Sequence, residues 1–218
     1  MQRTLILDLD GTLVDSVDDL ATALNAVLRA RSLPPAGRPE VTALIGNGAR
    51  VLMTGAFAAR GAPFDEAALA DFLADYTAHA AVATRPFPGM VDAMRTMQGT
   101  GWRFAVCTNK PEAAARALLA ELGLDPWFAA VGGGDSFPTR KPDPAHLLAT
   151  LAAAGGDARR AVMVGDHAND VLAATGASVP CIFAAWGYGP LAMADGAAVV
   201  AQRAADLPEL CERLVPGA

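Results

Sequence analysis

The sequence predicts an α/β fold: a doubly wound parallel sheet with an all-helical domain inserted after the first strand. From residue 90 onward, helical patterns alternate with short apolar strands, and repeated βα units of this kind form parallel sheets. Between residues 16 and 84, apolar residues recur at helical spacing and no convincing strand occurs. We therefore expect an α/β core domain of residues 1–15 and 85–218 and a helical insert of residues 16–84.

The first elements set up this division. Residues 4–9 form an apolar run typical of a strand that is buried on both faces of a parallel sheet. A helix is expected to begin at Ser16, because the apolar residues that follow it have helical spacing. Within the insert, further helices are expected at residues 40–45, 49–60 and 65–82, with Gly46-Asn47-Gly48 between the first two. Residues 85–89 return the chain to the core.

The second half of the chain repeats one pattern of helix followed by strand. Pro111 favours the start of a helix and Gly123 favours its end. Helices are expected at residues 90–98, 111–122, 144–154, 170–177 and 207–214. Strands are expected at residues 102–107, 128–131, 161–164 and 181–184, with a last edge strand at 199–200.

The composition excludes several classes of protein. The 218 residues are 53% hydrophobic, which suffices for a sizeable core, and the net charge of −6 argues against general nucleic-acid binding. The uncharged stretch 171–194 is interrupted by glycine and proline, and no secretory signal precedes the first strand, so we expect no membrane partner. The three widely spaced cysteines predict buried free thiols in a reducing compartment. We expect a cytoplasmic monomer or homodimer.

Two carboxylates follow the first strand and are the first candidates for chemistry. In an extended strand, residues two apart point to the same face, so Asp8 and Asp10 are expected to leave the strand together. Ligands of open α/β sheets bind at the carboxyl ends of the strands. Two neighbouring carboxylates repel each other and suit a cation, a shared proton or a catalytic task. The alternative is a solvated Asp-Gly turn.

Polar residues also follow later strands of the predicted sheet. Each has an ordinary explanation: Asn109 as a helix cap, Asp170 as a residue of a first helical turn and Lys141 as a solvated loop residue. With Thr108 and Asp166 they instead form an ordered set on one edge of the sheet. Lysine is scarce among the 17 basic residues, with only two in the chain, and one of them belongs to this set. A lysine that persists in an arginine-rich chain is more often needed as a lysine.

The chemistry that suits this set is phosphoryl transfer. A group of carboxylates is a hard, oxygen-only site that suits Mg²⁺, and the candidate metal ligands are Asp8, Asp10, Asp166 and Asp170. Asp8 can attack phosphorus and form an aspartyl-phosphate, while Asp10 can act as general acid and base. The expected ligands of the phosphoryl group are the hydroxyl of Thr108, nearby backbone N–H groups, the Lys141 ammonium and the neighbouring Gly11 and Asn109. The expected partner is therefore a small anionic phosphate ester.

Four motifs in order resemble those of the haloacid dehalogenase superfamily. The segment Asp8-Leu9-Asp10-Gly11-Thr12-Leu13-Val14-Asp15-Ser16 is similar to its signature. The other three motifs are matched in order by Thr108-Asn109, by Lys141-Pro142-Asp143-Pro144 and by the segment from Gly165-Asp166 to Asp170. The resemblance implies a Rossmann-like core and a helical cap inserted after the first motif, where the insert of residues 16–84 lies.

The same resemblance implies a role for each motif residue. Asp8 would be the nucleophile and a Mg²⁺ ligand, and Asp10 the acid and base and a Mg²⁺ ligand through its carbonyl. Asp166 would bind Mg²⁺ directly, and Asp170 would bind it through water or act as an anchor. Thr108 and Lys141 would bind the phosphoryl group.

Within this superfamily the sequence most resembles phosphoglycolate phosphatases. That resemblance is carried by Gly46-Asn47-Gly48, Thr108-Asn109-Lys110-Pro111, Gly133-Gly134-Asp135 and Trp186-Gly187-Tyr188-Gly189. His167 departs from it, since such enzymes often have serine there; it is either a bystander or a contact of substrate or metal. A guanidinium near a helix N-terminus is a ready anion site, so Arg50 is expected to meet a substrate carboxylate. The alternative for Arg50 is a solvated arginine.

Two further functions remain open at this point. One is a sugar-phosphate mutase, or a phosphatase of another small metabolite, from the same superfamily. The other is a phospho-receiver signalling domain, which also uses an aspartate phosphoacceptor with acids, a threonine and a lysine around Mg²⁺. Receiver domains are shorter, take the phosphoacceptor from a middle strand and lack a helical insert.

Overall fold

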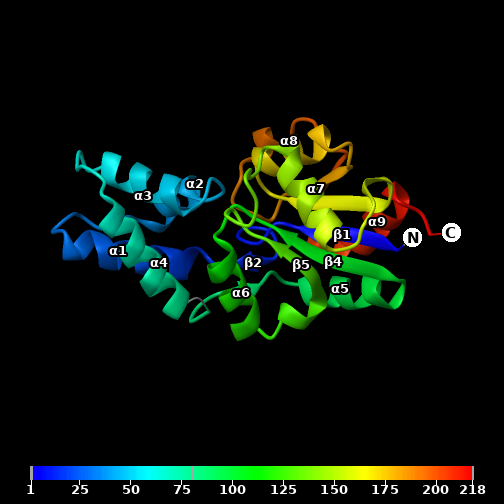
Figure 1. Ribbon diagram of the computed structural model, residues 1–218, viewed down its shortest axis with the longest axis horizontal. Coiled ribbons are helices and arrows are strands. Elements are labelled where there is room, and N and C mark those ends of the chain that lie inside the picture. Colours follow the sequence, from blue (N-terminus) through cyan, green and yellow to red (C-terminus); the bar gives the residue numbers. More distant parts are fainter. Residues whose placement is uncertain (1, 80, 218) are drawn as a thin grey trace.

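A computed structural model describes residues 2–79 and 81–217 (Figure 1). Its core is a sheet of six parallel strands in the order β5-β4-β1-β6-β7-β8. The strands are β1 (Arg3–Leu7), β4 (Trp102–Cys107), β5 (Phe128–Gly132), β6 (Ala161–Gly165), β7 (Cys181–Ala184) and β8 (Val199–Ala201). The predicted fold class, a doubly wound parallel sheet, is confirmed. No helix in residues 2–79 and 81–217 is both long and apolar enough to span a membrane.

The central position of β1 follows from its composition. Leu5, Ile6 and Leu7 are fully buried, and β4 and β6 pair with β1 on either side. Because side chains alternate along a strand, Leu5 and Leu7 join the larger hydrophobic cluster while Ile6 joins a separate cluster on the opposite face. A strand that is apolar on both faces has to be covered on both, which fixes β1 in the middle of the sheet.

Two layers of helices cover the sheet. On one face α7 (Pro144–Ala153) and α8 (Ala168–Gly176) pack over Ile6, Met163 and Phe183. On the other, the larger cluster includes side chains of α5 (Met90–Gly99), α6 (Glu112–Glu121) and α9 (Leu207–Leu214). Figure 1 shows α7 and α8 above the sheet and α5 and α6 below it. The three cysteines are buried free thiols, as predicted.

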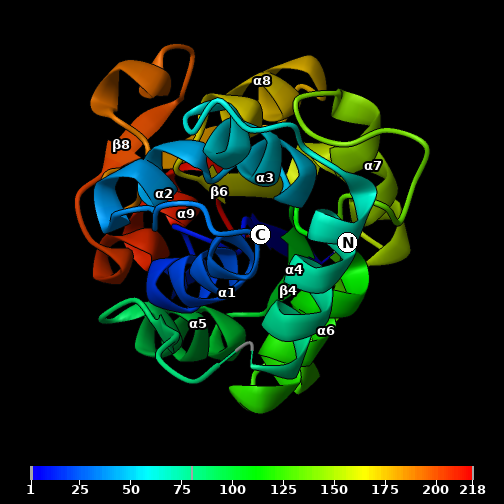
Figure 2. The same cartoon turned by 90° about the vertical axis from the view of Figure 1, so that its left-hand side faces the viewer.

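The insert consists of four helices that lie beyond the carboxyl ends of the strands. These are α1 (Val17–Ala30), α2 (Arg38–Leu44), α3 (Ala49–Ala58) and α4 (Glu66–Ala78). Between β2 (Val14–Asp15) and β3 (Arg85–Pro86) the described residues contain no strand, in agreement with the expected helical insert. Figure 2, viewed from the side of the insert, shows these helices spread in front of the sheet.

A two-residue ribbon at the base of the insert was not predicted. Val14 of β2 pairs with Pro86 of β3, and Asp15 pairs with Arg85, in antiparallel register. Two residues are too few for an alternating pattern, so the sequence offers no signal for this pairing. Arg85 and Pro86, where the chain returns to the core, therefore pair with Val14 and Asp15, where the chain leaves it.

Asp19, near the start of α1, ties the beginning of the insert to its end. Its buried carboxylate accepts hydrogen bonds from the backbone N–H groups of Ala83, at 3.0 Å, and Thr84, at 2.8 Å. It also accepts one from the Thr84 hydroxyl at 2.7 Å. A buried carboxylate is favourable only when such donors replace its water, and these three do so.

We expect Asp19→Ala to lower the free energy of unfolding by about 2–3 kcal/mol, because three donors lose a buried acceptor. Chemical denaturation followed by circular dichroism measures the change. The matched control is Asp18→Ala, which removes an exposed ion pair with Arg38 and is expected to cost about 1 kcal/mol or less. Equal losses in the two variants would contradict the structural role given to Asp19.

Candidate active site

The end of β1 places Asp8 at the edge of the sheet. The backbone N–H of Asp8 still donates to the Val164 carbonyl of β6 at 2.9 Å, so the residue is held by the sheet although the strand ends at Leu7. Its Oδ1 accepts from the Leu9 N–H at 2.7 Å and lies 2.9 Å from Lys141 Nζ. Oδ2 accepts no hydrogen bond from the described part of the chain, and Asp8 lines a pocket between insert and core. One oxygen is held and the other is available.

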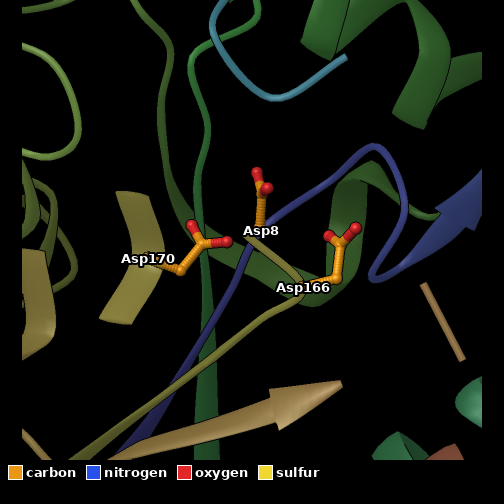
Figure 3. Close-up of side chains that lie close together, drawn as sticks. All are labelled: Asp8, Asp166 and Asp170. Atoms are coloured by element: carbon orange, nitrogen blue, oxygen red, sulfur yellow. The ribbon is translucent and has the colours of Figure 1, made fainter. Parts of the chain in front are cut away.

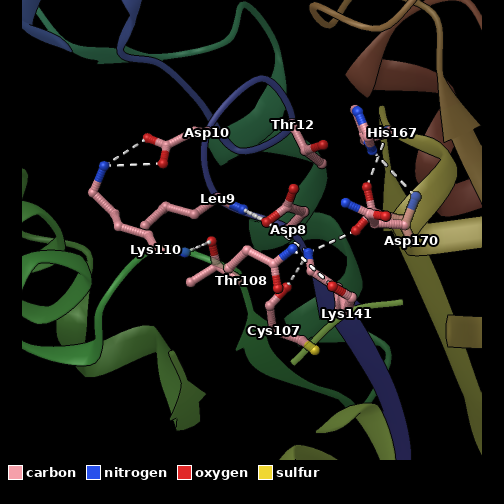
Figure 4. A network of polar contacts seen from close by, with 12 residues as sticks. Asp8, Leu9, Asp10, Thr12, Cys107, Thr108, Lys110, Lys141, His167 and Asp170 are labelled. Carbon is pink, nitrogen blue, oxygen red and sulfur yellow. Dashed lines mark hydrogen bonds and ion pairs between the residues drawn. The ribbon is translucent and has the colours of Figure 1, made fainter. Parts of the chain in front are cut away.

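Asp10 reaches the same pocket by way of a turn and not by strand alternation. The N–H groups of Leu13 and Val14 both donate to the Leu9 carbonyl, which folds the chain back immediately after Asp8. The Asp10 carboxylate accepts from Lys110 Nζ at 3.0 and 2.9 Å and from the Ser16 hydroxyl at 2.6 Å. Figure 4 shows Asp8 and Asp10 turned toward different lysines.

Gly11 is required by space as well as by backbone conformation. Its φ of +85° lies in the left-handed region, and an added Cβ would come within 2.5 Å of Asp166 Oδ2 and 2.8 Å of the Tyr188 ring. Glycine therefore lets the turn after β1 approach the end of β6. Its predicted part in phosphate binding stays a prediction.

Lys141 lies at the centre of the charged residues. Its buried Nζ lies 2.9 Å from Asp8 Oδ1, 2.6 Å from Asp170 Oδ1 and 2.6 Å from the Cys107 carbonyl (Figure 4). Burial opposes its charge, but the carboxylates of Asp170 and Asp8 outweigh this and raise the pKa of Lys141 above its usual value. The alternative of a solvated loop lysine is thereby wrong.

Three carboxylates form a buried cluster that fits a metal ion. Asp8, Asp166 and Asp170 each offer an oxygen, and these atoms lie within 4.8 Å of one another (Figure 3). Burial raises the pKa of Asp8 and of Asp166 to about 6, and the charge of Asp8 adds to the effect on Asp166. An oxygen-only donor set with this excess of negative charge suits a hard divalent cation.

Not all four predicted metal ligands contribute a carboxylate to this cluster. The Asp10 carboxylate pairs with Lys110 instead, which leaves its backbone carbonyl as the group that could meet a metal. Asp170 Oδ1 accepts from Lys141, and its Oδ2 accepts from the His167 N–H at 3.0 Å. Asp170 Oδ1 is held by the charged Lys141 ammonium, whereas the Asp166 oxygens accept only from uncharged donors, so the geometry favours Asp170 as an anchor for Lys141 over a direct ligand.

Asp166 connects the cluster to the segment 186–189. Its Oδ1 accepts from the Thr12 hydroxyl at 2.7 Å, and its Oδ2 accepts from the Tyr188 N–H at 2.8 Å. The Tyr188 hydroxyl in turn accepts from the N–H of Ser16 at 2.7 Å and donates to Asp15 Oδ1 at 2.8 Å. One tyrosine thus contacts both a candidate metal ligand and the point where the insert begins.

Thr108 and Asn109 follow β4 as expected, but Asn109 is not a helix cap. The N-cap of α6 is Pro111, and the first N–H of the helix, that of Glu112, donates to the Asp135 carboxylate at 2.7 Å. The Asn109 amide instead donates to the carbonyls of Gly46, in the insert, and Lys141, both at 3.0 Å. The backbone N–H of Thr108 donates to the Gly132 carbonyl, and both residues line the pocket. Their predicted contacts with phosphate remain predictions.

The loop Gly46-Asn47-Gly48 is fastened to the core. Asn169 donates to the Gly46 carbonyl at 3.1 Å and to Asn47 Oδ1 at 2.9 Å, beside the bond from Asn109. A Cβ at Gly46 would lie 2.7 Å from the ring of His167. His167 also caps α8, its Nδ1 accepting from the Asn169 N–H. His167 thus packs beneath the insert and caps α8, and it also lines a second pocket with Asp10 and Asp166, so its contact with substrate or metal stays a prediction. Asn169 is a contact that the sequence did not indicate.

Arg50 does not reach the site. Its exposed guanidinium makes two hydrogen bonds to the Glu66 carboxylate, at 2.6 and 2.8 Å, and the side chain does not line the pocket. Arg50 is a solvated arginine paired with Glu66 within the insert, which is the alternative stated for it, and the structure gives no support to its expected contact with a substrate carboxylate.

Lys110 and Tyr76 belong to the site and were not predicted. The Lys110 ammonium contacts Asp10 and lies 4.1 Å from the centre of the Tyr76 ring, which α4 contributes from the insert. The scarcity of lysine was the available signal, because the only two lysines of the chain both contact an aspartate of the first motif.

Known proteins resemble this chain in sequence and in structure. It is 43% identical over 216 residues to a phosphoglycolate phosphatase from Agrobacterium fabrum, covering 96% of this chain and 93% of the relative. A phosphoglycolate phosphatase from Caulobacter vibrioides is 42% identical over 217 residues, with 97% and 92% covered. The crystal structure of a predicted phosphoglycolate phosphatase from Haemophilus somnus superposes with a TM-score of 0.89 at 29% identity, over 96% of this chain and 97% of the other.

The family-level evidence agrees with the geometry at the sheet edge. A family model described as haloacid dehalogenase-like hydrolase matches residues 2–178, which include all four motifs noted in the sequence. Together with relatives more than 40% identical along nearly the whole chain, this match establishes that the chain belongs to the haloacid dehalogenase-like hydrolases.

Proposed function

We propose that this hydrolase is a Mg²⁺-dependent phosphatase that converts 2-phosphoglycolate to glycolate and phosphate. The observation that carries the proposal is the state of Asp8: Oδ1 is held by Leu9 and Lys141, while Oδ2, at the pocket, has no hydrogen-bond partner among the described residues. That is the arrangement a carboxylate nucleophile needs. The substrate is proposed from the names of the relatives that cover nearly the whole chain.

The reaction proceeds in two displacements on phosphorus. In the first, Asp8 Oδ2 attacks phosphorus, the bond to the ester oxygen breaks, and an aspartyl-phosphate forms. Asp10 gives a proton to the departing glycolate oxygen. In the second, Asp10 takes a proton from water, which attacks the same phosphorus and releases phosphate and free Asp8. Lys110 and Ser16 orient the Asp10 carboxylate for both proton transfers.

Charge balance decides whether an anionic ester can approach Asp8. Lys141 compensates part of the charge on Asp8 and Asp170, and Thr108 lines the pocket, where its hydroxyl can hold a phosphoryl oxygen. Mg²⁺ held by Asp8, Asp166 and the Asp10 carbonyl, with Asp170 as anchor, would supply the remaining positive charge. We propose that residues 16–84 act as the cap domain that shields this chemistry from water, on a core of residues 1–15 and 85–218.

The alternatives have less support. A receiver domain does not agree with membership in a hydrolase family or with a phosphoacceptor that follows the first strand. A sugar-phosphate mutase would need polar partners for a sugar, whereas the insert contributes mainly apolar side chains to the pocket.

The three buried free cysteines support action in the reducing cytoplasm.

We expect Asp8→Asn to reduce phosphate release from 2-phosphoglycolate by more than about 10³-fold, because the amide is a poor nucleophile. Steady-state assays with Mg²⁺ measure the loss, and circular dichroism checks that the fold is retained. The matched control is Asp92→Asn, on an exposed turn of α5, which is expected to keep full activity. Substantial Mg²⁺-dependent turnover by Asp8→Asn would refute the assignment of the nucleophile.

Chelation of divalent cations should abolish turnover, and added Mg²⁺ should restore it.

We expect Asp166→Asn to raise the Mg²⁺ concentration for half-maximal activity by about 10–100-fold, because one charged ligand is lost. Titration of activity with Mg²⁺ measures the shift, and Asp157→Asn, in the turn before β6 at the opposite edge of the sheet, serves as control. Unchanged Mg²⁺ dependence in Asp166→Asn would show that the cluster is not the metal site.

A further inference from the structure

The pocket between insert and core has two unlike sides. The core side presents polar groups from the ends of β1 and β4, including the carboxylates of Asp8 and Asp10. The insert side is mostly apolar, and its larger side chains are Leu20, Ile45, Leu52, Phe72, Leu73 and Tyr76. Among the described residues that line this pocket, Lys110 bears the one positive charge. An anionic group on a substrate other than its phosphoryl group would therefore be drawn toward Lys110.

Lys110 is held in place from both domains. Its side chain is 5% exposed, with Nζ at 3.0 and 2.9 Å from the two Asp10 oxygens and over the ring of Tyr76. The Asp10 carboxylate and the face of the Tyr76 ring both stabilise a positively charged ammonium at this position. An ammonium has three N–H donors, and the Asp10 carboxylate offers only two oxygens. Capacity for a further acceptor remains.

Tyr76 supplies a second, unused donor beside this ammonium. The residue is 2% exposed, its ring stacks on Phe72, and its hydroxyl has no hydrogen-bond partner in the described structure. Burial raises the pKa of Tyr76 to about 12, so the hydroxyl keeps its proton and can donate. A buried polar group without a hydrogen-bond partner costs free energy. This cost indicates that a bound ligand supplies the partner of the Tyr76 hydroxyl.

We infer that Lys110 and Tyr76 bind the carboxylate of the substrate and select phosphate esters of small 2-hydroxy acids. This inference rests on the proposed phosphatase function. In the proposed mechanism Asp10 donates a proton to the ester oxygen, and Lys110 contacts Asp10 directly. In 2-phosphoglycolate one carbon separates this oxygen from the carboxylate, so the carboxylate falls within reach of the Lys110 ammonium. The apolar side chains around Tyr76 offer nothing to sugar hydroxyls, whose burial without partners is unfavourable.

The test compares 2-phosphoglycolate with ethyl phosphate, which has the same ester linkage and no carboxylate. We expect Lys110→Met to lower the ratio of kcat/KM for the two substrates about 10²-fold, mainly through KM for 2-phosphoglycolate. Tyr76→Phe should lower the ratio about 10-fold, and Lys110→Arg should restore part of it. Lys110→Met is expected to slow ethyl phosphate as well, because Asp10 loses an orienting contact, so the ratio of the two substrates reports the contact with the carboxylate. Circular dichroism checks that each variant is folded.

Several outcomes would overturn the inference. An equal loss on both substrates in Lys110→Met would mean that the lysine only orients Asp10. A selective loss in Arg50→Met in place of Lys110→Met would assign the carboxylate to the insert's exposed arginine. Wild-type enzyme that hydrolyses ethyl phosphate but does not prefer 2-phosphoglycolate would overturn this inference alone. Wild-type enzyme that hydrolyses neither ester would overturn the proposed phosphatase function itself.

Discussion

The structure depends on the balance of charge where the central strand ends. Four aspartates converge there, and each of the two lysines of the chain compensates a different part of them. Lys141 holds Asp8 and Asp170 together across the sheet edge, and Lys110 holds Asp10 on the side of the insert. Asp166 is held by uncharged donors instead. This division separates Asp8, the proposed nucleophile, from Asp10, the proposed acid and base, although they lie only two residues apart. It also leaves a net negative charge suited to a cation.

The insert is fixed to this edge through polar contacts with short side chains. Asn109 and Asn169 both donate to the Gly46 carbonyl, and glycine at that position lets the loop lie directly on His167. Apolar side chains of the insert and of the core also belong to one buried cluster, but the bonds at the rim of the pocket are few and polar. Contacts of this kind are well suited to opening and closing around a small substrate.

Much of the fold and part of the site could be predicted from the sequence, for a physical reason. Strand ends, helix stops and the Asp8–Asp10 spacing are local patterns, and the parallel topology brings the strand ends together. Arg50 and Asn109 could not be assigned in this way, because their partners are set by packing: Glu66 lies one helix away, and Gly46 belongs to the other domain. Lysine scarcity pointed to Lys110, but only the fold brings it to Asp10, 100 residues earlier in the chain.

The short ribbon formed by β2 and β3 has a consequence for how such a protein can change. Because Asp15 and Arg85 pair side by side, the chain leaves the sheet and rejoins it at one point. An insertion whose ends meet imposes little strain on its host and adds little closure entropy as it lengthens. The helical segment is therefore a replaceable module, and one set of reactive groups could serve many substrates through exchange of the module above it.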